Sequence, residues 1–149
     1  HNFGNTLISF LFSGNKGSSF QEISKVASGG ELTRLMLAIK NISASKSGLD
    51  VLVFDEIDTG VSGEVASLMG DMMKEISKSK QLLVISHLPQ IASKADEHFK
   101  VQKSIFGNKT VSDIKRLNNE ERIEEIAKLL SGNKLSKEAF DNARVLLNQ

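Results

Sequence analysis

Val51–Gly63 reads VLVFDEIDTGVSG, and this stretch decides which fold class the sequence predicts. Its first four residues are apolar and two of them are valine, which is typical of a buried parallel strand. The run stops at two adjacent acids, Asp55 and Glu56, and a glycine-containing turn leads into the helical pattern of Glu64–Ile76. Because α/β sheets bind ligands at the carboxyl ends of their strands, one acid could hold a hydrated Mg²⁺ and the other orient a water. A solvated strand end followed by a helix cap is the alternative.

A second apolar strand, Gln81–Ser86 (QLLVIS), ends at His87. The helical pattern between the two strands predicts a strand–helix–strand crossover, which is normally right-handed. The ends of two parallel strands could lie side by side, so Asp55, Glu56 and His87 are expected at one edge of the sheet. A turn residue without a role is the alternative for His87. A short helix, opened by a proline, is expected over Gln90–Lys94.

The sequence Ser28-Gly29-Gly30-Glu31 opens an amphipathic helix that is expected to run to about Ser43. Ser28 is a good N-cap residue, the two glycines leave backbone N–H groups accessible, and Glu31 suits the helix dipole. Unpaired amides and the dipole together make such a helix start a plausible anion site. An ordinary capped helix is the alternative.

Two glycine-containing loops lack the spacing of a phosphate-binding loop. Leu7–Phe12 is expected to be a strand, and the loop Ser13–Ser19 (SGNKGSS) follows it. Its lysine precedes the second glycine, whereas a Walker A loop has the lysine directly after that glycine. Gly107-Asn108-Lys109-Thr110 fails for the same reason, so both are interpreted as turns.

The last third of the chain predicts a hairpin and two helices. Residues 97–105 and 109–117 alternate apolar and polar side chains, which predicts an antiparallel hairpin carrying a surface histidine, His98. Asn118 or Asn119 is expected to cap the next helix, and Ser136 the last one. Both helices have an apolar face, so we expect a C-terminal helical pair.

Composition excludes several classes of protein. The 149 residues are enough for one domain, with 40% hydrophobic and 25% charged residues. No apolar run approaches the ~20 residues of a membrane span, so no membrane partner is expected. The chain has no cysteine for disulfides or thiolate metal sites, and three histidines argue against zinc. It begins with His1 rather than Met, so we expect a piece of a longer protein or a processed one.

Three stretches carry a resemblance to a known family. VASGGELTRLMLAIK (26–40), VLVFDEIDTGVSG (51–63) and LLVISHLPQIASKAD (82–96) resemble the signature motif, the Walker B strand with its D-loop, and the switch histidine of ATP-binding-cassette ATPases. DEIDTGVSG followed by ISHLPQIA is similar to the RecN family, bacterial DNA-repair relatives of the structural-maintenance-of-chromosomes (SMC) proteins. The resemblance covers about Leu7 to Val111.

The resemblance implies roles at the second and third motifs. Asp55 would coordinate Mg²⁺ through water, Glu56 would polarise the attacking water, and His87 would contact the γ-phosphate of ATP. Asp58 and Ser62 are expected to contribute to nucleotide binding. Ser62 stands where transporter cassettes and SMC proteins usually place an aspartate, a departure that matches the RecN pattern.

The first motif implies a head–head dimer. Ser28, Gly29, Gly30 and Glu31 would bind the γ-phosphate of ATP held by a second subunit, so that two heads sandwich two nucleotides. Phosphoryl transfer needs mainly positioning and charge neutralisation, and these residue types supply both.

Walker A and the Q-loop are absent from the sequence. In this family they lie in the N-terminal half of the head, which a coiled-coil arm separates from the C-terminal half. Residues 1–149 are therefore expected to be a single domain, the C-terminal lobe of the head. Its expected partners are the N-terminal half, a second head and, through the full-length protein, double-stranded DNA in the bacterial cytoplasm at the nucleoid. We expect the chain alone to bind ATP weakly and not to hydrolyse it.

The expected fold is α/β. It is half of a three-layer-like P-loop NTPase head, a mostly parallel sheet flanked by helices, with an antiparallel hairpin and a C-terminal helical pair. A transporter cassette is one alternative, disfavoured by Ile57-Asp58 and by the missing Walker A. A non-catalytic dimerisation or regulatory domain with a similar fold is the other, and the second acid, Glu56, argues against it.

Overall fold

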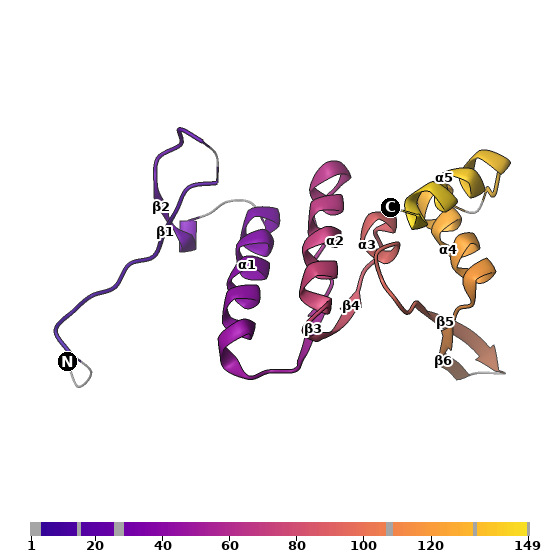
Figure 1. Cartoon of the computed structure of the whole chain (residues 1–149), viewed down its shortest axis with the longest axis horizontal. Helices are drawn as coiled ribbons and strands as arrows, with labels where there is room; N and C mark the ends of the chain where they lie inside the picture. The colour runs from indigo at the N-terminus through magenta and orange to yellow at the C-terminus, as the bar shows by residue number, and fades with distance from the viewer. Residues whose placement is uncertain (1–3, 15, 26–28, 107–108, 133, 149) are drawn as a thin grey trace. The chain divides into compact units, whose positions relative to one another are not determined.

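The computed structural model describes residues 4–14, 16–25, 29–106, 109–132 and 134–148 (Figure 1). The chain divides into two compact units, His1–Leu49 and Asp50–Gln149. The first unit holds the signature-like helix, and the second holds both apolar strands, the hairpin and the helical pair.

The first unit is a small hairpin followed by a long helix. β1 (Leu11–Phe12) pairs antiparallel with β2 (Gln21–Glu22), and a 3₁₀ turn, η1 (Ile23–Lys25), and α1 (Gly29–Ser47) follow. The strand predicted over Leu7–Phe12 forms only at its last two residues, so that prediction was wrong for Leu7–Phe10. A strand is stable only with a paired neighbour, and the described part of the chain pairs only those two residues with β2.

The second unit is built on a parallel strand pair. β3 (Val51–Asp55) and β4 (Gln81–Ile85) pair in register from Val51↔Gln81 to Asp55↔Ile85 and are connected through α2 (Gly63–Ser77). This confirms the predicted strand–helix–strand unit.

Only one face of this strand pair is covered. Successive side chains of a strand point to opposite faces, and on β3 Phe54 is 3% exposed whereas Val53 is 61% exposed. The covered face joins the apolar stripe of α2 in a core that contains Leu52, Phe54, Ala66, Met69, Met73 and Ile76. The sequence predicted burial on both faces, and the structure provides it on one.

A short helix, α3 (Pro89–Ala92), packs closely against α2. A Cβ atom added at Gly70 would lie 2.9 Å from the backbone oxygen of Gln90, so glycine lets the two helices approach. Ion pairs Lys74–Asp96 and Lys94–Asp71 connect α2 to the segment that follows α3.

The C-terminal elements match the prediction. β5 (Phe99–Phe106) and β6 (Lys109–Arg116) form an antiparallel hairpin, and α4 (Asn119–Ser131) packs against α5 (Lys137–Leu147) (Figure 1). Asn118 caps α4 in a capping box with Glu121, and the Ser136 hydroxyl accepts from the Ala139 N–H at the start of α5. The buried contact between the two helices is formed by Ile126, Ala127, Ala139 and Ala143.

No helix in the described part of the chain is long and apolar enough to cross a membrane.

Candidate functional site

The ends of β3 and β4 lie side by side. Asp55 is opposite Ile85 in the parallel register, and the Glu56 N–H donates to the Ile85 carbonyl at 3.1 Å. Two residues beyond Ile85 comes His87, so the acid pair and the histidine follow neighbouring strands at the same edge. The structure thus brings together the three residues that the sequence placed at one edge of the sheet.

Glu56 has a left-handed backbone, with φ of 47°, the one positive φ among the described non-glycine residues. This conformation is uncommon for a side chain other than Asn or Asp and costs free energy. Thr59 holds it, because its N–H and its hydroxyl both donate to the Glu56 carbonyl, at 3.2 and 2.9 Å. The carboxylates of Asp55 and Glu56 are exposed. Strained backbone of this kind concentrates at functional sites, which supports a role for this edge.

Asp58 points inward, unlike the acid pair. The residue is 1% exposed, and its Oδ2 accepts from the Ser86 hydroxyl and, at 3.3 Å, from the His87 N–H. The same Oδ2 lies 3.7 Å from Nδ1 of His87, whose side chain is 70% exposed. The Ser86 hydroxyl also accepts from the Leu88 N–H at 3.0 Å. Sequence reasoning missed Ser86, and its position immediately before His87 was the signal that could have found it.

Ser62 is the N-cap residue of α2, with extended backbone, but its side chain makes no capping hydrogen bond. The turn before it is closed by the Val61 N–H, which donates to the Asp58 carbonyl at 3.0 Å. Ser62 is exposed. Helix capping therefore does not explain why a serine stands at this position.

The signature-like residues belong to the first unit. Ser28 lies outside the described residues; α1 begins at Gly29, which is exposed, and Gly30 is buried. Glu31 is half-buried in the first turn, against Gly14 of the preceding loop, where an added Cβ would collide with its carboxylate. The structure thus confirms the predicted helix start at these residues.

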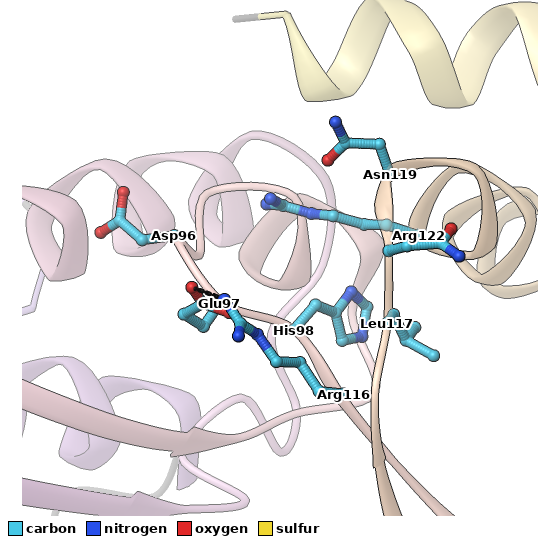
Figure 2. A pocket seen from close by; sticks show the side chains of 8 residues that line it. Asp96, Glu97, His98, Arg116, Leu117, Asn119 and Arg122 are labelled. Atoms are coloured by element: carbon cyan, nitrogen blue, oxygen red, sulfur yellow. Dashed lines mark hydrogen bonds and ion pairs between the residues drawn. The ribbon is translucent and has the colours of Figure 1, made fainter.

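A shallow pocket of about 460 Å³ lies elsewhere in the second unit, and Figure 2 shows its lining. Arg116 forms an ion pair with Glu97 there, and Arg122 donates to the carbonyls of Ser93, at 2.8 Å, and Ala95. The full lining is Asp96, Glu97, His98, Arg116, Leu117, Asn118, Asn119 and Arg122. None of the residues at the strand ends lines this pocket.

His98 is half-buried in this pocket, so the prediction of a surface histidine was wrong. Its buried Nδ1 has no hydrogen-bond partner among the described residues. Burial, and then the nearby Arg122 cation, lower the pKa of His98 below its ordinary value. Alternation of side chains along the hairpin could not show this, because the contact comes from α4.

The donor set at the strand edge suits magnesium. In the described part of the chain no group of three or more His, Cys, Asp or Glu side chains could hold a metal ion by itself. Mg²⁺ is usually bound by one or two carboxylates together with water and substrate phosphates. The exposed carboxylate of Asp55 fits that pattern, and the exposed carboxylate of Glu56 beside it is left to accept from a water.

Comparison with known proteins gives the family. No family model matches the chain. The DNA repair protein RecN of Halalkalibacterium halodurans is 40% identical over 141 residues, which cover 95% of this chain and 25% of that protein. The chain is RecN-like. DNA repair protein RecN of Rickettsia conorii is 43% identical over 97% of the chain and 27% of that protein, and that of Vibrio cholerae is 41% identical over 94% and 25%.

The RecN-like chain therefore spans about a quarter of the length of the curated relatives it matches. Its fold is that of SMC ATPase heads. A chain from a study of ATP-driven dimerization and DNA-stimulated activation of SMC ATPases superposes with a TM-score of 0.59 at 20% identity, over 79% of this chain and 70% of that one. An Smc head bound to the C-winged helix domain of ScpA gives 0.58 at 26% identity, over 72% and 32%. These likenesses confirm the expected fold class.

Proposed function

We propose that the chain is the C-terminal lobe of the ATPase head of a RecN-like protein that acts in DNA double-strand-break repair. The observation that carries this is the parallel register of β3 and β4, which sets the acid pair and His87 at one sheet edge. The names of the relatives, DNA repair protein RecN, support the biological role. The place of action would be the bacterial cytoplasm, at the nucleoid.

At this edge the chain's own residues would divide the work of ATP hydrolysis. Asp55 would hold Mg²⁺ through water, and Glu56 would accept a hydrogen bond from the attacking water and orient it. His87 would contact the γ-phosphate, which its 70% exposed side chain allows. Bound Mg²⁺ would neutralise phosphate charge. The exposed Ser62 would lie near the nucleotide as well.

The start of α1 would serve a second nucleotide. Ser28, Gly29, Gly30 and Glu31 would bind the γ-phosphate of ATP held by another head, so that two heads close on two ATP molecules. The support is that α1 begins at an exposed glycine, at a helix start whose amides and dipole suit phosphate. Asp58 would contribute to the first site from its buried position.

The missing half of the head would cover the open face of β3 and β4. Parallel sheets are normally covered on both faces, yet the face bearing Val51, Val53, Leu83 and Ile85 is exposed. A segment carrying Walker A is the natural occupant of this apolar face, and residues 1–149 would be one lobe beside it. Without that segment the main phosphate cradle is absent, so the chain alone should bind ATP weakly and show no turnover.

ATP hydrolysis by the chain mixed with a separately produced Walker A segment, with and without duplex DNA, tests the proposal. Turnover should require both pieces, increase with DNA, and disappear with Glu56→Gln, which keeps the shape of the side chain and removes its charge. Association of the two pieces without turnover would contradict the catalytic assignment. Turnover by the chain alone that Glu56→Gln abolishes would contradict the split site.

A further inference from the structure

We propose that Asp58 and Ser86 are positioning residues that fix the switch segment, Ser86–Leu88, against the end of β3. The inference rests on the proposed function, in which His87 contacts the γ-phosphate. It changes the role of Asp58 from a group that touches nucleotide to one that acts through His87, and it adds Ser86, which the sequence did not indicate.

Hydrogen bonds that start at one carboxylate oxygen of Asp58 hold two residues directly and a third through the Ser86 hydroxyl. Oδ2 of Asp58 accepts from the Ser86 hydroxyl and from the His87 N–H, and the Ser86 hydroxyl accepts in turn from the Leu88 N–H. Bonds to an ionised acceptor are stronger than neutral ones. These bonds fix the backbone on both sides of the His87 Cα. They therefore also fix the direction in which the imidazole projects from the backbone.

The imidazole ring of His87 also lies near this carboxylate. Oδ2 of Asp58 lies 3.7 Å from Nδ1 of His87, so that edge of the ring faces the carboxylate. Nε2 is on the opposite side of the ring and is the nitrogen left to meet a phosphate. Asp58 thus links the acid-bearing turn after β3 to the histidine after β4, across 29 positions of sequence.

Stability alone does not account for a carboxylate here. The Asp58 side chain is fully buried, and its Oδ1 has no hydrogen-bond partner among the described residues. A buried carboxylate with one oxygen unpaired costs free energy, and a neutral side chain of the same shape would avoid part of that cost. Locally unfavourable choices of this kind are expected where a residue serves function.

Steady-state ATP hydrolysis by the complete protein, the chain joined to its Walker A segment, tests the inference. Ser86→Ala removes the bonds to Asp58 and Leu88, and Ser86→Thr keeps the hydroxyl. Ser77→Ala is the matched control, because the half-buried Ser77 hydroxyl also donates one hydrogen bond, to the Lys74 carbonyl at 2.8 Å, away from the strand ends. Thermal unfolding midpoints of all variants are measured in parallel.

We expect Ser86→Ala to lower kcat about tenfold while KM for ATP changes less than about twofold, because a misplaced group costs mainly transition-state stabilisation. Ser86→Thr should restore kcat, and Ser77→Ala should keep it despite a similar loss of stability. Asp58→Asn, which retains an acceptor without the charge, should lower kcat with KM unchanged, and it decides the question if Ser86→Ala does not fold.

Failure of the positioning role and failure of the proposed function give different results. A kcat for Ser86→Ala and Asp58→Asn equal to that of Ser77→Ala, in an active wild-type protein, overturns the positioning role and leaves the proposed function standing. A complete wild-type protein that does not hydrolyse ATP overturns the proposed function, and the positioning role with it.

Discussion

Gly70→Ala probes the close packing that places α3, the helix directly after the switch segment. The new Cβ would lie 2.9 Å from the Gln90 backbone oxygen, 3.2 Å from Lys94 Cγ and 3.5 Å from Ile91 Cα. The first of these is a backbone atom, which cannot rotate away, so α2 and α3 must separate. Inserting a methyl group into a packed contact costs about 1–3 kcal/mol.

The substitution also has a favourable effect, because alanine has a higher helix propensity than glycine. Relative to glycine it favours the helical state by about 1 kcal/mol, which offsets part of the packing cost. The clash involves backbone on a buried face, so we take the upper half of the packing range, about 2–3 kcal/mol, and expect a net loss of about 1–2 kcal/mol. In a chain of 149 residues each kcal/mol lowers the unfolding midpoint by roughly 2–4 °C, so the expected drop is roughly 2–8 °C.

Urea and thermal unfolding, followed by circular dichroism, measure this change. Leu68→Ala is the control, because Leu68 is an exposed residue of the same helix and its replacement should change the free energy of unfolding by less than about 0.5 kcal/mol. Gly70→Ser should cost more than Gly70→Ala. A Gly70→Ala protein as stable as wild type, or more stable, would refute the inferred contact between α2 and α3.

Three further perturbations test other parts of the structure. Arg122→Met removes the guanidinium that donates to the Ser93 and Ala95 carbonyls and should lower the free energy of unfolding by about 2 kcal/mol in urea titrations; a loss under about 0.5 kcal/mol would contradict it. Asn118→Ala removes the side-chain oxygen that accepts from the Glu121 N–H, one of the two bonds of the capping box, and should cost about 1 kcal/mol, whereas Asn118→Ser should recover most of it. The pKa of His98 is lowered in the folded chain, so the unfolded chain binds its proton at higher pH and stability falls as pH drops below about 6.5. His98→Gln should remove that fall between roughly pH 7 and pH 5, and an unchanged slope would argue against it.

Local patterns predicted much of the second unit. The two apolar strands and the caps Asn118 and Ser136 depend on residues within a few positions of one another, and the structure forms them. The apolar pattern of α2 predicted an inward stripe that included Leu68 and Met72, and this was wrong for those two residues, which are exposed, while Met69 and Ile76 are buried as expected. The strand over Leu7–Phe12 was wrong beyond β1, because strand formation depends on a partner that local alternation does not supply.

Sequence by itself determined which residues stand at the ends of β3 and β4, because strand ends follow from where an apolar run stops. The sequence alone therefore identifies Asp55, Glu56 and His87 as the residues at these strand ends. Only the tertiary structure decided that Asp58 turns inward onto Ser86, 28 positions away, and that His98 is half-buried beside Arg122. The physical reason is that a polar side chain is buried only where a distant segment supplies its partner, and no local spacing specifies which segment that is.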